Sequence, residues 1–230
     1  MCYNYYGDGM KINNKMISII YKAVLCIVGI FSLIATTGVL DGNMNLNIFS
    51  MFTTLSNLLC VIYFILDIIY LIRNYNKKGL VEWFPLLKGI TTMAITITLI
   101  VAHFVLKMSF SFDSFTNMSF LGLHYIIPIM TILDWILFDK KGFIKVYSPI
   151  VWTIAPAIYM IVAYNSAVFG NGIGVNGDSK YPYDFMDIDK LGIPTVVFNI
   201  VLMTIIYFAI GYVYYFIDRL MIRKRKKRTN

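Results

Sequence analysis

Residues 47–72 read NIFSMFTTLSNLLCVIYFILDIIYLI and contain one charged side chain, Asp67. A helix rises about 1.5 Å per residue, so this run reaches about 39 Å, more than the bilayer's hydrocarbon core of about 30 Å. A helix also satisfies its own backbone hydrogen bonds, as a segment in lipid must. The run therefore predicts a transmembrane helix.

Five more runs of this kind follow the same pattern, at 16–40, 84–106, 119–138, 147–169 and 193–217. Each holds about 20 or more predominantly apolar residues. The first run is too long for a signal peptide and lacks a small-residue cleavage site before Asp41, so we interpret it as an uncleaved span. We expect an all-α fold: a polytopic membrane protein with a six-transmembrane-helix bundle, forming a single domain over residues 1–230.

The composition excludes a soluble globule. Hydrophobic residues make up 59% of the chain and charged residues 14%, whereas soluble proteins carry about 25% charged residues. Membrane lipids are therefore the expected partners. The three cysteines, Cys2, Cys26 and Cys60, are too few and too scattered for a disulfide framework or a metal site. We expect no metal and no cofactor.

The basic residues are distributed asymmetrically. Seventeen of the twenty, with Lys22 and Lys88 counted as flanking charges, belong to the terminal segments and the second and fourth connections. The positive-inside rule then places the N-terminus and the C-terminus in the cytoplasm. The tail RKRKKR at 223–228 is interpreted as a topology anchor, so no nucleic-acid partner is expected. The predicted location is a cell membrane, and the Ile, Asn and Lys richness favours a bacterial cytoplasmic membrane.

Polar residues in the second run recur at helical spacing. They are Thr53, Ser56, Asn57, Cys60 and Asp67. Residues at this spacing share one side of a helix, and such a side faces protein or a cavity rather than lipid. Thr53 lies about 9 Å below the outer end of the run, and Asn57 is one turn deeper. The spacing predicts a polar interior near the outer face.

Two histidines fall at a similar depth. His103 and His124 lie about 6 and 7 Å from the outer ends of the third and fourth runs. We therefore expect Thr53, Asn57 and both histidines to line one cavity. Pro128 has no N–H for the carbonyl of His124 four residues earlier, so the helix should open beside that histidine and leave an acceptor free.

We expect the aspartates of the chain to have structural rather than catalytic roles. Asp67 and Asp134 lie near the cytoplasmic ends of their runs, where each could pair with Arg73 or a nearby lysine. The outer connection at 170–192 holds four aspartates whose spacing does not match a calcium-binding loop. We interpret it as a solvated connector, with a lid over the outer face as the alternative.

The polar layer suggests nucleophilic chemistry. A threonine hydroxyl is a weak nucleophile and needs a base within hydrogen-bonding reach. Thr53 with His124 is the economical pair, with Ser56 or Asn57 donating to the oxyanion and His103 in support. The chain has no G-x-S-x-G elbow, Walker loop or H-E-x-x-H motif, which excludes soluble hydrolase, nucleotide-binding and zinc-protease functions.

Three segments together resemble the Pr6Pr family of bacterial six-span membrane proteins. They are FTTLSNLL at 52–59, LHYIIPIMTILDWILFDKK at 123–141 and YPYDFMDIDKLG at 181–192. The pattern is more distantly similar to the androgen-induced membrane hydrolases, which cleave fatty acid esters of hydroxy fatty acids with an intramembrane threonine and histidine. That resemblance implies Thr53, or Thr54 one register later, as nucleophile and His124 as its partner.

Three classes of function follow. The leading hypothesis is an intramembrane threonine/histidine-dependent lipid-ester hydrolase. The second is a small-molecule or lipid transporter or binding protein, because a polar stripe in a helix bundle also suits a substrate cavity. Pro128 and Pro156 have no counterparts in the first three spans, so the inverted repeat of many transporters is not evident. The third is a structural membrane protein without catalysis.

Overall fold

The computed structural model describes residues 12–80, 83–105, 111–169 and 179–226. Within these ranges the chain is helical without strands, and six helices are long and apolar enough to cross a membrane. The all-α six-span prediction is confirmed. The spans are Lys15–Thr36 (α1), Phe52–Arg73 (α2), Pro85–Val105, Phe115–Phe138, Ser148–Phe169 and Ile193–Ile222.

Three spans are composite. The third joins α3 (Pro85–Ile100) to a π-helical segment, η3 (Val101–Val105), and the fourth joins α4 (Phe115–Leu121), a second π-helical segment η4 (Gly122–Ile126) and α5 (Ile127–Phe138). The fifth consists of α6 (Ser148–Trp152) and α7 (Ile154–Phe169), and the sixth lies in α9 (Ile193–Lys226). Short helices η1 (Val39–Asp41), η2 (Leu46–Ser50), η5 (Asp184–Met186) and α8 (Ile188–Leu191) complete the chain.

Turn and cap chemistry moves several span boundaries away from those predicted by hydropathy. The first run was expected to reach residue 40, but α1 ends at Thr36, because Gly38 takes a left-handed φ of 76° that breaks the helix. The second starts at Phe52 rather than at residue 47, after the separate turn η2. The fourth starts at Phe115 rather than at residue 119, where the Ser114 side chain accepts a hydrogen bond from the backbone of Asn117.

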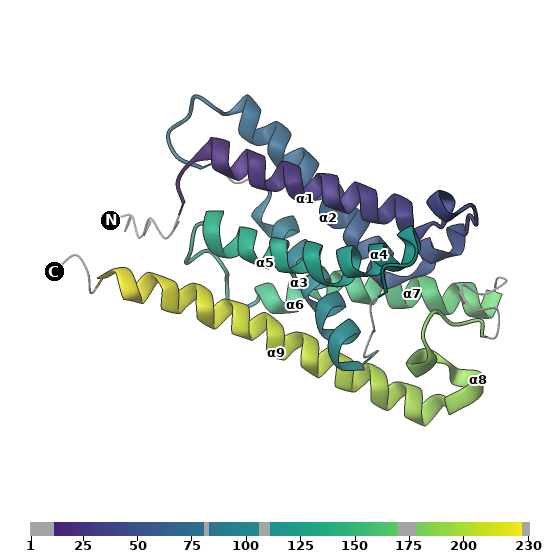
Figure 1. Cartoon of the computed structure of the whole chain (residues 1–230). Helices are drawn as coiled ribbons and strands as arrows, with labels where there is room; N and C mark the ends of the chain where they lie inside the picture. The colour runs from purple at the N-terminus through teal and green to yellow at the C-terminus, as the bar shows by residue number, and fades with distance from the viewer. Residues whose placement is uncertain (1–11, 81–82, 106–110, 170–178, 227–230) are drawn as a thin grey trace.

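The six spans lie side by side, with α1 and α2 at one edge of the bundle and α9 along the other (Figure 1). We call the end at which α1 and α3 begin and α2 and α5 end the basic end. The start of α1 and the end of α9 both lie there, as an even number of crossings requires, while η1, η2 and α8 lie at the opposite end (Figure 1).

Span α3 packs into both halves of the bundle. Its Ile95 belongs to a buried cluster with α1 and α2 side chains such as Leu25 and Phe64. Its Met93 and Ile97 belong to a second cluster, with Trp135, Trp152, Tyr207 and Tyr214 from α5, α6 and α9. Through these contacts α3 holds the α1–α2 pair and the α6–α9 side in one bundle.

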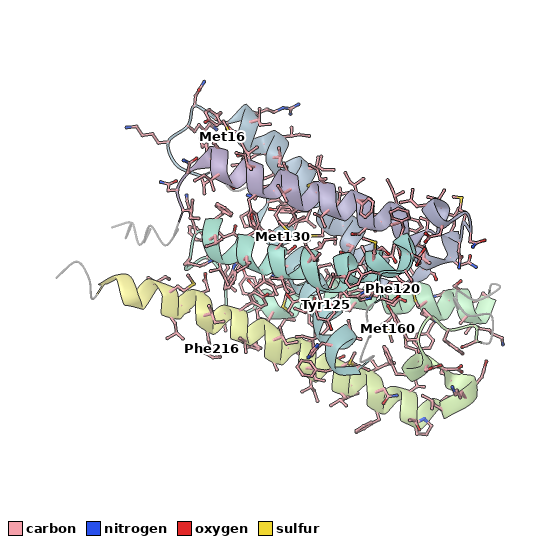
Figure 2. The ribbon with its side chains drawn as sticks, in the orientation of Figure 1. Met16, Phe120, Tyr125, Met130, Met160 and Phe216 are labelled. Carbon is pink, nitrogen blue, oxygen red and sulfur yellow. The ribbon has the colours of Figure 1, made fainter. Side chains whose placement is uncertain are left out.

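Span α9, unlike α3, exposes much of its apolar surface. Many large apolar side chains along it are exposed, among them Phe198 at 65%, Ile205 at 59% and Phe216 at 59%, and Figure 2 shows Phe216 on the outward side of α9. Apolar side chains that would be costly in water are well placed facing lipid tails. The burial pattern agrees with an integral membrane protein whose α9 surface contacts lipid.

The described part of this connection, residues 179–192, is only partly the solvated connector that we expected: Asp184 and Asp189 are exposed, but other side chains are buried. Tyr181 and Met186 are buried against Tyr159 and Ala163 of α7. Asp187 is also buried, and its carboxylate accepts a hydrogen bond from the Ser179 hydroxyl at 2.7 Å. Aromatic and apolar side chains between the aspartates pack this segment against α7 and bring Tyr183 to the start of α2.

Candidate functional site

The polar face of α2 points into the bundle, as its spacing predicted; its buried members are Ser56, Asn57, Cys60 and Asp67. Ser56 Oγ lies 2.9 Å from Thr98 Oγ1 of α3, and Cys60 Sγ lies 3.2 Å from Thr131 Oγ1 of α5. Hydrogen bonds of this kind between membrane helices contribute about 0.6 kcal/mol each. In this structure Ser56 and Cys60 link helices.

Asn57 joins α2 to the π-helical segment η4. Its Nδ2 donates to the Leu123 carbonyl at 3.0 Å. In a π-helix each carbonyl bonds the N–H five residues later, as the Gly122 carbonyl does with Ile127. Five residues after Leu123 stands Pro128, which has no N–H. The Leu123 carbonyl therefore lacks a partner within its own helix, and Asn57 supplies one from α2.

We expected a different backbone carbonyl, that of His124, to be without a helical partner. We predicted that Pro128 would release the carbonyl of His124, counting four residues back as in an α-helix. The π-helical register instead leaves the Leu123 carbonyl, which Asn57 already occupies. The prediction that the helix is disturbed beside His124 agrees with the π-helical segment, but the carbonyl affected is that of Leu123 rather than that of His124, and it is bonded by Asn57 rather than open.

His124 itself is buried at 6% exposure, and its Nδ1 lies 2.9 Å from the Phe120 carbonyl. A carbonyl can only accept, so the neutral ring carries its proton on Nδ1 and keeps a lone pair on Nε2. This is the tautomer that a general base acting through Nε2 needs.

Thr53 lies at the start of α2, where the first N–H groups of a helix have no partner within it. The residue before the helix, Met51, makes no side-chain cap. Instead the Tyr183 hydroxyl, from the segment after α7, makes hydrogen bonds with the Thr53 side chain and with the backbone at Phe52 and Thr53. Burial raises the pKa of Tyr183, so this phenol stays protonated.

Thr53 and Tyr183 form one wall of a cavity of about 450 Å³, here called the Thr53 cavity. The cavity lies between the start of α2, the end of α3, α7 and α9, and the segment around η5 closes one side. No charged side chain is among the described residues that line it. Its polar groups are hydroxyls, from Thr53, Thr98, Thr153, Thr204, Tyr159, Tyr183 and Tyr207.

The structure does not bring the four predicted residues into one cavity. Thr53 lines the Thr53 cavity, but Asn57, His103 and His124 are not among its described lining residues. Among the described residues no hydrogen bond joins Thr53 to His124. His103 has an exposed side chain, and its Nδ1 lies 3.0 Å from the Tyr125 hydroxyl. The rotation of the helices about their axes turns these side chains toward different neighbours.

The second predicted threonine has a different environment. Thr54 is buried at 3% exposure and does not belong to the described cavity wall, whereas its neighbour Thr53 does. Successive helical residues point about 100° apart, and at this position the rotation turns Thr54 away from the cavity wall and into the bundle. Of the two threonines that the sequence left open, the geometry favours Thr53 as the one a ligand in this cavity would meet.

A buried ionic network lies toward the basic end. The Lys22 ammonium is 2.7 Å from Asp67 and 3.8 Å from Asp134, and Lys88 bonds Asp134 and Asp139. Asp67 and Asp134 thus pair with lysines, one of the two partners proposed, and not with Arg73. Lys22 and Lys88, counted above as flanking charges, lie inside α1 and α3 with 4% and 5% exposure.

Three residues that shape these sites, Lys22, Lys88 and Tyr183, were not predicted from the sequence. Lys22 lies seven residues inside an apolar run, and that position was itself a signal of an internal ion pair. Lys88 lies three residues after Pro85, which begins its helix, and could have been identified in the same way. Tyr183 had no comparable signal, because its role depends on how residues 179–192 fold onto the start of α2.

Comparison with protein-family models, curated proteins and solved structures finds no match for this chain. The described residues form six candidate spans, consistent with an integral membrane protein, around an apolar cavity that carries hydroxyl groups.

Proposed function

We propose that this membrane protein binds a neutral lipid in the Thr53 cavity. The observation that carries the proposal is a wall of apolar side chains with hydroxyl groups and without a charged side chain among its described residues. Its volume of about 450 Å³ falls within the range of small-molecule sites, about 300–1,000 Å³. An ionised headgroup would lose its hydration there without an opposite charge in return, so an uncharged ligand fits best.

The ligand's orientation follows from the polar groups. The hydroxyls of Thr53 and Tyr183 meet at the start of α2, and the Tyr159 hydroxyl, which donates to the Ser50 carbonyl at 3.0 Å, lies beside them. Apolar side chains such as Met160 and Met203 line the remainder. An ester or hydroxyl group therefore belongs at the Thr53–Tyr183 end, with the acyl chain along α7 and α9.

Cavity filling tests the binding proposal. Ala157 lines the cavity, so Ala157→Phe should weaken binding of a photoreactive diacylglycerol by about tenfold, corresponding to roughly 1.4 kcal/mol. Ala209 on α9 is exposed and outside the described wall, so Ala209→Phe makes the same change as a matched control. Equal crosslinking of both variants and the unaltered protein would contradict the proposal.

Hydrolysis of the bound ester is the second candidate, favoured by the position of Thr53. Its hydroxyl lies at the polar end of the cavity, beside the Tyr183 hydroxyl, and a tyrosine hydroxyl is a donor of the kind that stabilises an oxyanion. His124 would serve as base through the free lone pair on Nε2. In this proposal Thr53 attacks the ester carbonyl, His124 takes the proton and returns it to the leaving alcohol, and water releases the acid. The two side chains must approach each other when substrate binds.

Four variants separate hydrolysis from binding. Thr53→Ala should abolish turnover of a fatty acid ester while Thr54→Ala retains it. His124→Gln should also abolish turnover, because Gln cannot accept a proton, and His103→Gln should retain most activity. A Thr53→Ala protein with undiminished turnover would exclude the threonine mechanism. No turnover in the unaltered protein, with lipid still bound, would leave binding as the function.

We further propose the Pr6Pr family, a bacterial cytoplasmic membrane and cytoplasmic termini for this chain. The three sequence segments support the family, and the charge asymmetry supports the orientation. Lys22 and Lys88 are buried inside their helices and are left out of this count. The predicted cytoplasmic segments then hold fifteen basic residues, and the remaining connections hold three. That difference is still large enough to set topology by the positive-inside rule.

A further inference from the structure

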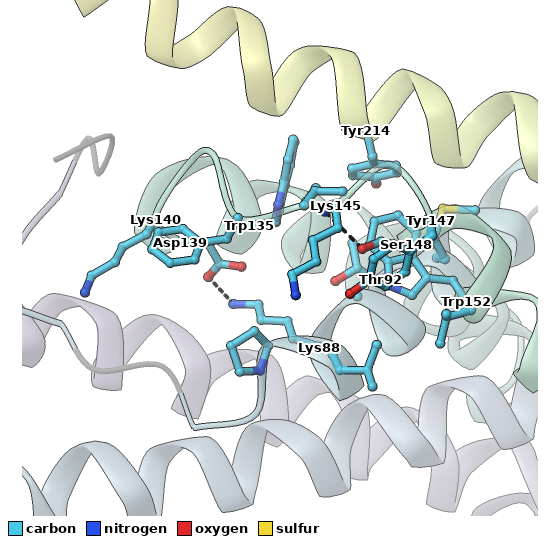
Figure 3. A pocket seen from close by; sticks show the side chains of 17 residues that line it. Lys88, Thr92, Trp135, Asp139, Lys140, Lys145, Tyr147, Ser148, Trp152 and Tyr214 are labelled. Carbon is cyan, nitrogen blue, oxygen red and sulfur yellow. Dashed lines mark hydrogen bonds and ion pairs between the residues drawn. The ribbon is translucent and has the colours of Figure 1, made fainter. Parts of the chain in front are cut away.

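A second cavity, of about 410 Å³, opens at the basic end and is called here the Lys88 cavity (Figure 3). It lies between the start of α3, the end of α5, α6, α9 and the connection at 139–147. It has no described lining residue in common with the Thr53 cavity. Any ligand held here would therefore be additional to the one proposed above.

The wall of the Lys88 cavity carries net positive charge. Its charged lining residues are Lys88, Lys140, Lys145 and Asp139, which leaves a formal charge of +2. In Figure 3 the side chains of Lys88 and Lys145 extend toward the same region from different elements. Lys88 is already paired with Asp134 and Asp139, so the excess positive charge at this wall comes from Lys140 and Lys145, and it favours an anionic ligand.

The two lysines, Lys88 and Lys145, differ in how firmly they are held. Lys88 is buried and bonds Asp134 and Asp139, which fixes its ammonium at the cavity floor. Lys145 is exposed, and its side chain hydrogen-bonds Tyr147, which raises its pKa and keeps the ammonium charged. The pair thus offers one fixed charge and one that can adjust to a ligand.

The wall also contains a polar atom without a partner. Thr92 is buried at 3% exposure, and its Oγ1 has no hydrogen-bond partner among the described residues. Buried hydroxyls are usually bonded, so an unbonded one in a cavity wall indicates a ligand or water position. The rest of the wall is largely apolar and aromatic, with Trp135, Trp152 and Tyr214. A ligand here meets charge at one side and apolar surface at the other.

We propose that the Lys88 cavity binds the phosphate headgroup of an anionic phospholipid. Lysine ammonium groups bind phosphate oxygens through charge-assisted hydrogen bonds, and basic recesses at the ends of membrane helices attract anionic lipids. The position of the cavity at the end of the spans matches headgroup depth, and the exposed apolar side of α9 beside it offers a path for acyl chains. A free phosphate-bearing anion shares the headgroup chemistry but makes no use of the apolar walls.

Tryptophan fluorescence gives a direct test, because Trp135 and Trp152, two of the three tryptophans, line the cavity. The full chain is placed in phosphatidylcholine nanodiscs containing increasing fractions of brominated phosphatidylglycerol. If the Lys88 cavity binds this lipid, quenching should saturate at a low fraction of brominated phosphatidylglycerol. Brominated phosphatidylcholine, used as the control, should quench only in proportion to its fraction. Quenching without preference for the anionic lipid would overturn the proposal.

Variants of exposed lysines provide the matched comparison. Lys145→Gln should weaken the saturable binding by roughly threefold to tenfold, and Lys145→Arg should retain it. Lys78 is exposed at the same end and outside the described wall, so Lys78→Gln should change binding less than about twofold. Equal weakening by Lys145→Gln and Lys78→Gln would mean diffuse attraction and would overturn the site. Unchanged melting temperatures verify that each variant folds.

A competition arm identifies the source of the phosphate. Soluble glycerol phosphate should leave the saturable quenching unchanged at concentrations matching the lipid, since it lacks acyl chains. Full displacement would assign the cavity to a free anion and reject the lipid. Ala157→Phe, which fills the Thr53 cavity, should leave this binding intact, so the two proposals fail separately.

Discussion

At the scale of single residues, the buried ion pairs are the most consequential contacts in the bundle. Lys22 and Asp67 lie 2.7 Å apart with side-chain exposures of 5% and 4%. Removing one partner of a buried pair leaves an uncompensated charge, which costs about 3–5 kcal/mol, while replacing both is often close to neutral. The pairs between α1, α2, α3 and α5 therefore specify how these helices sit together.

A double-variant cycle tests this. Lys22→Met should lower stability by about 3–5 kcal/mol in detergent, because Asp67 is left charged and buried. Combining it with Asp67→Asn should recover much of the loss, so the two changes should be strongly non-additive in thermal unfolding. The exposed pair Lys180–Asp189, at 3.5 Å, serves as a control, since Lys180→Met should change stability by less than about 1 kcal/mol. Additive effects at Lys22 and Asp67 would contradict the coupling.

At the scale of elements, the fourth span is governed by its π-helical turn. The turn and Pro128 together remove the helical partner of the Leu123 carbonyl, and Asn57 of α2 replaces it. The same turn carries His124. Because π-helical turns often mark functional positions, the α2–η4 contact supports both the packing and the placement of this histidine.

We expect Asn57→Ala to cost about 1–3 kcal/mol, because it leaves the buried Leu123 carbonyl without a donor. Pro128→Ala restores a backbone N–H to the fourth span, so it should reduce the cost of Asn57→Ala. Thermal unfolding of the two single variants and the double variant measures this coupling. If the cost of Asn57→Ala is the same in both backgrounds, the carbonyl is satisfied in another way.

A second element, α4, is capped from a distant part of the chain. The Asp41 carboxylate accepts hydrogen bonds from the Thr116 hydroxyl, the Thr116 N–H at 2.8 Å and the Phe115 N–H at 3.0 Å. These bonds, with the Thr116 hydroxyl first, lower the pKa of Asp41 below its usual 3.8. A lowered folded-state pKa means that the carboxylate stabilises the fold above the unfolded pKa, and that this stability is lost as pH falls through the folded value.

The expected outcome is a pH-dependent effect of Asp41→Asn. The variant should melt at a lower temperature than the unaltered protein at neutral pH, and the difference should shrink below about pH 4, where the native carboxyl also becomes protonated. Asp184→Asn is the control, because that carboxylate is 86% exposed and makes one surface ion pair at 3.6 Å. A difference that stays constant from pH 7 to pH 3 would rule out the cap as its source.

At the scale of the whole molecule, the six crossings put the start of α1 and the end of α9 at one end (Figure 1). In the orientation that we propose from the charge asymmetry, that end is the cytoplasmic one. The Thr53 cavity then faces the outer leaflet, and the Lys88 cavity faces the inner leaflet. The two proposed lipid sites would serve opposite sides of the bilayer.

Cysteine labelling in intact cells tests the orientation. With Cys2→Ser as background, Asp189→Cys should react with a membrane-impermeant maleimide from outside, because residue 189 is exposed at the opposite end. Lys78→Cys, exposed at the basic end, should react only after permeabilisation. Cys26 and Cys60 are buried and should stay unlabelled. Labelling of Lys78→Cys in intact cells would reverse the orientation.

The sequence by itself determined the fold class, the six spans and the inward-facing stripe of α2. Hydropathy and helical periodicity are local properties, and in a membrane the long apolar runs leave few alternatives to a helix. The boundaries at Gly38 and Ser114 moved by a few residues, because the first depends on the left-handed backbone of Gly38 and the second on a side-chain cap, neither of which hydropathy reports.

Only the tertiary structure decided which polar groups meet. Depth along a helix follows from counting residues, but helix rotation and the identity of neighbouring helices depend on packing of the whole bundle. For this reason Thr53 faces Tyr183 and not His124, and Lys22 and Lys88 turn inward to the aspartates instead of flanking the spans. Residues 179–192 likewise became part of the candidate site when they folded onto α7 and brought Tyr183 to the start of α2.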